Sequence, residues 1–392
     1  MYENQTIITE FILLGFGDIY SFQILLFPPF LVIYIVTVMG NTLIFGLVVF
    51  DRHLYTPMYF FLGNLSFLEA CYSSTLFPRM LLAFLTGNRM ISFDSCLIQW
   101  YIYCSLEVTE CCLLCAMSYD RYLAICKPLH YAITMTSQTC IQLAAAAWIN
   151  GFFICLILLI MMLQLTFCGP NEMDHYFCDY FPILKVSCSD TSLIKMVGTV
   201  VAAVFTLPPF LLTLTSYVYI IATMLKIPSS TGRKKAFSTC SSHLVVVSIF
   251  YGSLMIAYMV PEQELKRNMG KFPSLLYTVL PPLLNPFIYS LRNKEVKDAL
   301  RNIVEGEGFS VKSIKRQMAA LSFLRFELHL QPQLRVMGVR PFVVWDVGSL
   351  GPIEPMYDHC GLEVGVLPAE DAKGNNKNLS EEDCNGRQGA LY

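Results

Sequence analysis

Long apolar runs separated by short polar segments are the dominant pattern of the sequence. A helix needs about 20 residues to cross the hydrocarbon core of a bilayer, and seven runs are long enough. Several contain proline, which helices in lipid tolerate better than helices in water. The predicted spans are approximately Ile24–Phe50, Met58–Phe84, Leu97–Met117, Ile141–Leu165, Met196–Leu225, Leu244–Val260 and Phe272–Leu291. The pattern therefore predicts an all-α membrane protein with a seven-transmembrane helix bundle over residues 24–291.

Residues 1–23 are predicted to be extracellular. They lack a basic region, and the apolar piece Phe11–Leu14 is too short for a cleavable signal peptide. Lys and Arg are more frequent in the loops that this topology places inside the cell. Asn4 begins a glycosylation sequon on the outer side, in agreement with this orientation. Sequons at Asn64, inside the second span, and at Asn378, in the C-terminal tail, are interpreted as chance matches.

The chain changes character after the last span. Residues 292–304 place Val296 and Leu300 on one face with basic residues between them, which predicts a short amphipathic helix on the inner leaflet. Residues 305–392 are predicted to be an atypical cytoplasmic tail, because they contain no run long enough to span. The polar stretch Asp371–Gln388 is typical of disordered segments.

Composition supports a membrane protein. Only 14% of the 392 residues are charged and 55% are hydrophobic, whereas soluble domains carry about 25% charged residues. The net charge of −2 argues against a nucleic-acid partner. Most of the 15 cysteines lie in apolar runs, where cysteine behaves as a small hydrophobe. No nucleophile or metal cluster facing water is evident, so no enzymatic activity is expected.

Six sequence blocks at the ends of the predicted spans form a set in a fixed order. They are PMYFFLGNLS (Pro57–Ser66), MSYDRYLAIC (Met117–Cys126), KPLHY (Lys127–Tyr131), SY (Ser216–Tyr217), KAFSTCSSHL (Lys235–Leu244) and PLLNPFIYSLRN (Pro282–Asn293). Together they resemble the odorant (olfactory) receptors of the tetrapod-type class, a family of rhodopsin-like G-protein-coupled receptors. The resemblance covers the chain to about Val304, so the tail is a departure from the family pattern and is assigned no function.

The resemblance implies a receptor for odorants, which are small volatile organic ligands. It also implies coupling to a stimulatory heterotrimeric G protein, a rise in cyclic AMP, and a place in the plasma membrane of olfactory cilia. A chemosensory receptor outside olfactory tissue is one alternative. A membrane transporter is another, although seven spans do not divide into equal inverted repeats and no paired broken helices are evident.

Two carboxyl groups lie midway along predicted spans, Glu69 in the second and Glu110 in the third. A central carboxylate costs up to about 3 kcal/mol on insertion scales, so such residues usually face the bundle interior. In rhodopsin-like receptors this region, together with Asn41 and Asn285, binds sodium. The resemblance therefore implies an ion or proton switch, with a sodium ion near Glu69 and Glu110. The alternative is that both acids are protonated and join neighbouring helices by hydrogen bonds.

Asp120 and Arg121 end the third span at its inner side. The adjacent opposite charges are interpreted as a lock that breaks when the helices shift and frees the guanidinium group for the G protein. The alternative is an ordinary interfacial pair, because arginine commonly extends to the lipid headgroups. Tyr217 and Tyr289 are then expected to be switch tyrosines that stabilise the partner-binding form.

Four cysteines lie on the side predicted to be oxidising. Cys168, Cys178 and Cys188 follow at ten-residue intervals in one loop, and Cys96 begins the third span. Four cysteines allow three pairings. The family resemblance selects Cys96–Cys178 and Cys168–Cys188, which would hold the loop as a lid. The segment His175–Asp179 matches a metal-ligand spacing proposed for the family, but a disulfide sulfur is no longer a thiolate ligand, so no metal site is predicted.

A ligand pocket is expected between the outer halves of the third, fifth, sixth and seventh spans. The candidates share helical faces and form a mostly apolar, aromatic wall, which suits small volatile molecules. For each apolar candidate, plain helix packing is the alternative. An ionisable group at this depth, Glu107, would favour cationic ligands if charged and hydrogen-bond acceptors if protonated, or would only bond a neighbouring helix. The candidates are Tyr103, Cys104, Glu107, Val108, Cys111, Val201, Ala202, Phe205, Thr206, Tyr251, Leu254, Met255, Tyr258, Leu275 and Thr278.

Overall fold

The computed structural model describes residues 8–16, 20–51, 54–168, 170–226, 244–257 and 271–292, with residues 296, 297 and 299. The chain divides into two units, Met1–Leu324 and Arg325–Tyr392, and only the first contains described residues. The predicted tail, Asn4 and Tyr258 lie outside them, as do the side chains of residues 289–292. Within the predicted amphipathic helix, the three described residues are helical, with Val296 and Ala299 buried and Lys297 exposed.

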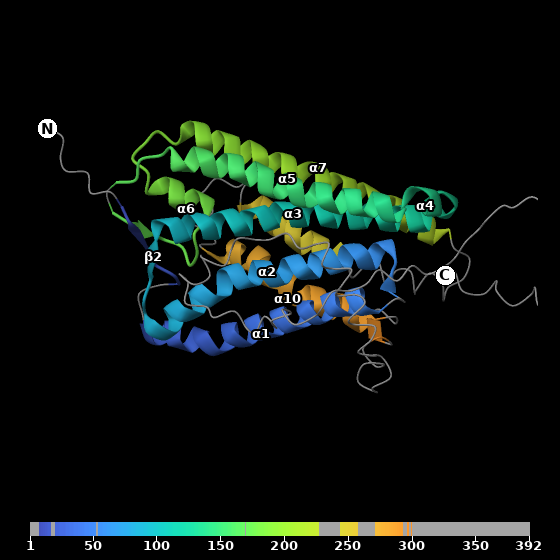
Figure 1. Cartoon of the computed structure of the whole chain (residues 1–392), viewed down its shortest axis with the longest axis horizontal. Helices are drawn as coiled ribbons and strands as arrows, with labels where there is room; N and C mark the ends of the chain where they lie inside the picture. Colours follow the sequence, from blue (N-terminus) through green and yellow to red (C-terminus); the bar gives the residue numbers. More distant parts are fainter. Residues whose placement is uncertain are drawn as a thin grey trace, which may run out of the picture. The chain divides into compact units, whose positions relative to one another are not determined.

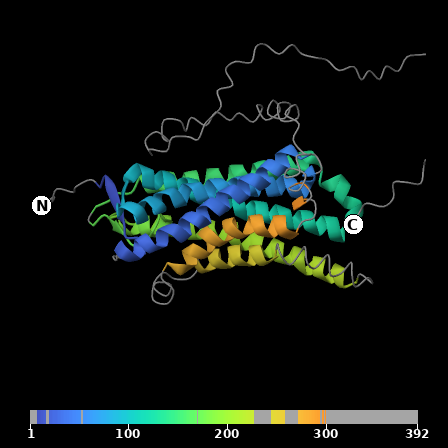
Figure 2. The same cartoon turned by 90° about the horizontal axis from the view of Figure 1, so that it is seen from below.

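The architecture is that of an all-α membrane protein built as a seven-helix bundle, as predicted. Long helices run side by side in both views of the fold (Figures 1 and 2). Four of the described helices are long and apolar enough to cross a membrane by length and composition: α1, α3, α5 and α7. The seven helices are α1 (Tyr20–Phe50), α2 (Pro57–Thr86), α3 (Phe93–Cys126), α5 (Ser137–Leu163), α7 (Ser192–Leu225), Leu244–Ala257 and α10 (Phe272–Arg292).

Helix α3 is the most enclosed of the four apolar spans. Of its apolar window 72% is buried, compared with 11% in α7 and 22% in α1, and α3 packs against α2, α5 and α7. The outward faces of the other spans carry exposed large apolar side chains, such as Ile149 and Phe153 on α5 and Leu212 on α7. An apolar surface of this kind suits a lipid surround, because soluble monomers rarely expose large apolar patches.

Helix α3 extends at both ends beyond the apolar run that predicted the third span. Helix α3 begins at Phe93 rather than Leu97 and ends at Cys126 rather than Met117. At its start, the Ser92 side chain accepts a hydrogen bond from the Ser95 backbone N–H (3.3 Å) and caps the helix. At its end, Asp120 and Arg121 terminate the apolar run, but charged residues do not stop a helix. The chain turns only at Lys127, before Pro128 begins the short helix α4 (Pro128–Thr134).

A glycine allows α3 and α5 to pack closely. A side-chain carbon added at Gly151 on α5 would collide with the Thr109 hydroxyl and the Ser105 carbonyl oxygen on α3. Small residues at such crossings let helix backbones approach, which is how helices commonly associate in lipid. The α3–α5 contact therefore depends on the absence of a side chain at this position.

A small sheet that the sequence analysis did not predict caps one end of the bundle. Strand β1 (Glu10–Leu13) pairs antiparallel with β2 (Met90–Ser92) and parallel with β3 (Glu172–Met173), in the order β2-β1-β3. The Phe11 ring packs 5.7 Å from that of Phe93 and 6.0 Å from that of Phe167. We call this end the sheet end, and the opposite end, which carries α4, the α4 end (Figure 1).

Candidate functional site

A cavity near the sheet end is enclosed mainly by α3 and α7. Leu158 of α5, Leu254 of helix Leu244–Ala257, and Tyr180 and Phe181 of the short helix α6 (Tyr180–Lys185) complete its wall. Its volume is about 60 Å³, below the roughly 300–1,000 Å³ of typical ligand pockets. A ligand would therefore have to push the wall outward. The predicted residues in this wall are Cys104, Glu107, Val108, Cys111, Val201, Ala202, Phe205, Thr206 and Leu254.

The remaining pocket candidates lie elsewhere. Tyr103 donates a hydrogen bond to the Asp179 carboxylate in the loop, and Tyr251 donates to the Cys111 carbonyl oxygen (2.8 Å). Thr278 shares a hydrogen bond with the Tyr176 hydroxyl (3.1 Å). These polar groups are satisfied in helix and loop contacts, so the side chains pack in the core. Met255 and Leu275 are partly buried against that core and do not line the cavity.

Several residues that line the cavity were not among the pocket candidates predicted from the sequence. Tyr180 and Phe181 come from a loop that was expected only to cover the bundle, and Leu158 comes from α5, which was not expected to take part. The signal for Tyr180 and Phe181 would have been an aromatic pair that begins two residues after the loop cysteine Cys178. The missed residues are Trp100, Leu158, Tyr180, Phe181, Gly198 and Thr199.

Among the described residues that line this cavity, Glu107 is the only acidic side chain, and none is Lys, Arg or His. The side chain is 5% exposed. A larger cavity, about 430 Å³, lies near the α4 end and includes Tyr55, Phe60 and Ile141. Its described wall holds no acidic or basic side chain. We therefore place the candidate ligand site at the first cavity, where a polar group can orient a ligand.

Two disulfides fix the loop beside this cavity. Cys96 is joined to Cys178, with Cα atoms 5.5 Å apart, and Cys168 to Cys188, with Cα atoms 5.7 Å apart. Both are the pairings that the family resemblance implied. The Cys178 backbone N–H also donates to the Gln99 side-chain oxygen (3.1 Å), which ties the loop directly to α3.

The loop segment before Cys178 is packed into the bundle. The Phe177 ring meets Tyr103 edge-on at 5.1 Å, and the His175 ring nitrogen Nε2 lies 3.2 Å from the Ser274 hydroxyl of α10. Burial lowers the pKa of His175, although the nearby Asp179 carboxylate opposes the shift. The neutral imidazole is therefore the form that packs here at neutral pH.

Three of the four predicted ion-switch residues meet in the interior. Asn285 of α10 donates a hydrogen bond to Glu69 of α2, and Glu110 of α3 lies close enough for its carboxyl group to interact electrostatically with that of Glu69. All three side chains are almost fully buried. The fourth residue, Asn41, instead joins α1 to α10 by donating to the Pro282 carbonyl oxygen (3.0 Å). Buried carboxyl groups in contact can share a proton, because like charges suppress double ionisation.

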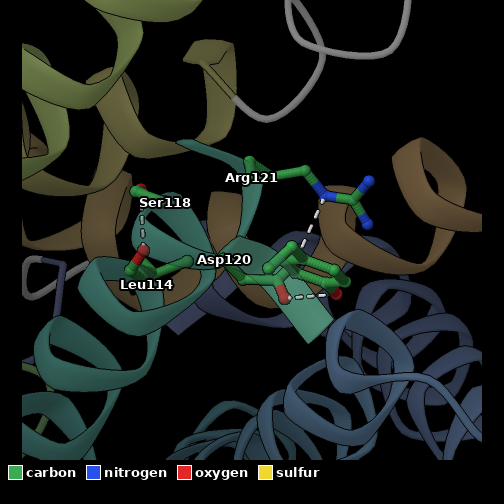
Figure 3. Close-up of polar contacts among 5 residues, drawn as sticks. Leu114, Ser118, Asp120 and Arg121 are labelled. Atoms are coloured by element: carbon green, nitrogen blue, oxygen red, sulfur yellow. Dashed lines mark hydrogen bonds and ion pairs between the residues drawn. The ribbon is translucent and has the colours of Figure 1, made fainter. Parts of the chain in front are cut away.

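Asp120 and Arg121 pair near the α4 end. Arg121 Nε lies 3.8 Å from Asp120 Oδ2, while the terminal guanidinium nitrogens point away from the carboxylate (Figure 3). The Tyr131 hydroxyl of α4 donates to the other carboxylate oxygen (2.9 Å). Asp120 is 1% exposed and the Arg121 side chain 27%. Tyr131 was given no role in the sequence analysis, yet it holds the carboxylate of the predicted lock.

The structure describes the side chain of only one of the two predicted switch tyrosines. Tyr217 of α7 is buried, in a small cluster with Ile220 and Met224. The side chain of Tyr289 lies outside the described residues. Their role as switches stays a prediction.

Comparisons with known proteins identify one family. The family model described as "Olfactory receptor" matches residues 30–306. Human Olfactory receptor 2AP1 is 47% identical over 303 residues, which cover 77% of this chain and 98% of that protein. Human Olfactory receptor 6C3 is 48% identical over 301 residues (77% and 97%), and mouse Olfactory receptor 5G26 is 46% identical over 300 residues (76% and 94%). The chain is therefore a multi-pass membrane protein that belongs to the olfactory receptor family of G-protein-coupled receptors.

Proposed function

We propose that this receptor binds small volatile organic molecules in the cavity beside Glu107, activates a stimulatory G protein and raises cyclic AMP. The observation that carries the proposal is a mostly apolar cavity whose described wall holds a single carboxyl group, under a loop that two disulfides fix. Few polar groups in an apolar wall suit ligands with one functional group. The partly exposed Arg121 at the other end of α3 is the proposed contact for the G protein.

A panel of odorants in transfected cells with a cyclic AMP reporter tests this function. At least one volatile ligand should raise cyclic AMP in cells that display the receptor and not in cells that lack it. Uptake of the same ligands, measured in parallel, separates a receptor from a transporter. Ligand uptake without any cyclic AMP response at normal surface expression would contradict the proposal.

Glu107 is expected to decide which class of ligand is active. If its carboxyl group is ionised, a cationic ligand gains several kcal/mol at an effective dielectric near 20. If it is protonated, it donates a hydrogen bond worth about 1 kcal/mol, or roughly fivefold in potency. Glu107→Gln should retain neutral ligands in either case and lose cationic ones only if the charge matters. Glu107→Ala should weaken both classes.

Neighbouring wall positions provide the control for Glu107. Val108→Ala changes the same part of α3 without removing a polar group, so it should not change the preference between neutral and cationic ligands. Dose–response curves for each active ligand measure the change. Unchanged potency for every ligand in both Glu107 variants would remove this residue from the pocket.

We also propose that the contact between Glu69 and Glu110 holds a sodium ion or a shared proton. The burial of both carboxyl groups and the Asn285 hydrogen bond to Glu69 support it, because buried acids need a counter-charge or a proton. The site would favour the inactive form. If the site holds sodium, replacing sodium by choline in the assay buffer should shift odorant potency in the wild type and not in Glu69→Gln, whereas a shared proton predicts no shift in either.

We propose that the N-terminus is extracellular and that the receptor resides in the plasma membrane, in olfactory cilia. Treatment with an N-glycosidase should increase the gel mobility of the wild type and leave Asn4→Gln unchanged. Asn378→Gln is the matched control, because its sequon is expected to face the cytoplasm. Asn64 is unsuited to glycosylation, since its side-chain oxygen accepts a hydrogen bond from Trp148 within the bundle (3.2 Å). A mobility shift that disappears in Asn378→Gln would reverse the orientation.

A further inference from the structure

Two thiols from different helices meet at the wall of the cavity. Cys155 of α5 donates a hydrogen bond to the sulfur of Cys104 on α3, with the two sulfur atoms 3.3 Å apart. Cys155 is fully buried, whereas Cys104 is half-buried and lines the cavity. Both are free cysteines. The pair is separate from the loop disulfides and has no part in the proposed contacts with the G protein.

The close helix crossing holds this pair together. Gly151 lies one helical turn from Cys155 on α5 and abuts the Ser105 carbonyl oxygen, next to Cys104 on α3. A side chain at Gly151 would push the helices apart at this level. The close packing of the two helix backbones therefore keeps the two thiols at short range.

We propose that Cys104 and Cys155 form a redox modification site, which hydrogen peroxide oxidises to a disulfide linking α3 to α5. The two thiols and one peroxide molecule give one disulfide and two water molecules. Both S–H bonds and the O–O bond break, one S–S bond forms, and the peroxide is reduced. Because a disulfide bond is about 2.0 Å long, the sulfur atoms must approach by roughly 1.3 Å from their observed 3.3 Å. Hydrogen peroxide is small and uncharged, so it can reach the thiol that lines the cavity.

The modification changes the ligand site. Once bonded to Cys155, the Cys104 sulfur is drawn from the cavity towards α5, and the wall loses a thiol hydrogen-bond donor. Glu107 lies one turn along α3 from Cys104, on the same wall. Oxidation of the receptor therefore changes the potency of ligands that contact this part of the wall.

Peptide mapping tests the cross-link directly. Full-length receptor in membranes is treated with increasing hydrogen peroxide, blocked with N-ethylmaleimide, digested and analysed by mass spectrometry without reduction. A linked pair of peptides containing Cys104 and Cys155 is expected in the wild type and lost in Cys104→Ser and Cys155→Ser. Cys112→Ser should keep it, because this half-buried thiol on the same helix lies outside the cavity wall.

Two outcomes of the mapping would overturn the site. The first is recovery of Cys104 and Cys155 as separately alkylated thiols at every peroxide dose, with Cys96–Cys178 intact. The second is linkage of Cys104 to a different cysteine. Because the readout is the cross-link, it does not depend on the proposed odorant function.

A second measurement tests the consequence for the ligand site. The potency of an odorant from the panel is compared before and after peroxide treatment. A shift is expected in the wild type and in Cys112→Ser, and none in Cys155→Ser, whose side chain does not line the cavity. An equal shift in Cys155→Ser, or a cross-link that leaves wild-type potency unchanged, would refute a link between this site and ligand binding.

Discussion

Cys178→Ser is expected to abolish surface expression or odorant response. The loss of a native disulfide typically costs about 2–5 kcal/mol, and this one joins residues 82 positions apart in the sequence. It also positions the Cys178 backbone N–H against Gln99 and the Phe177 ring against Tyr103. Without it, the loop segment that carries Tyr180 and Phe181 into the cavity wall loses its attachment to α3. Surface labelling and the cyclic AMP reporter measure the two effects.

Cys96→Ser removes the same bond from the other side and should have the same effect. Cys71→Ser is the control, because Cys71 is a free cysteine on α2, and it should retain both surface expression and response. Peptide mapping that finds Cys178 as a free thiol in the wild type would contradict the pairing itself.

The bundle could be predicted because the bilayer sets the length of each apolar run. The boundaries of α3 could not, since the apolar run ends at Asp120 and Arg121 while the helix continues to Cys126. The sheet at the sheet end was also missed. Strands of two to four residues are too short to show alternation, and β1 pairs with segments far away in the chain. Its pairing therefore leaves no local pattern to find.

The wall residues of the cavity could be predicted where the periodicity of a single helix determines which side chains face inward. The faces of α3 and α7 follow from helical periodicity, and both contribute most of the wall residues that were expected. The absence of the expected α10 residues, Leu275 and Thr278, from the described wall was not predictable, because the rotation of α10 about its axis depends on its neighbours. Asn41 of α1 binds the Pro282 carbonyl oxygen, and Tyr176 of the loop binds Thr278. These contacts keep Thr278 out of the cavity wall, and no single helix encodes them.

Arg121→Ala is expected to eliminate the cyclic AMP response while leaving ligand binding unchanged. The guanidinium group is the proposed contact for the G protein, and its terminal nitrogens already point away from Asp120 (Figure 3). The nearest predicted pocket residue on α3, Cys111, is ten positions away, or about 15 Å at 1.5 Å per residue. Removing the charge should therefore leave the cavity intact. The reporter measures coupling, and binding of a labelled panel odorant measures the cavity.

Substitution of Asp120, the partner of Arg121, is the strongest test of the proposed lock. Asp120→Asn keeps the shape of the side chain and removes the charge that holds Arg121 near α4, so basal cyclic AMP should rise. Tyr131→Phe removes the hydroxyl that donates to Asp120 and should raise it by a smaller amount, because the ion pair itself remains. If these residues only anchor α3 at the membrane interface, all three variants should lose surface expression together, with no opposite effects on signalling. A normal response from Arg121→Ala at normal surface level would exclude the lock altogether.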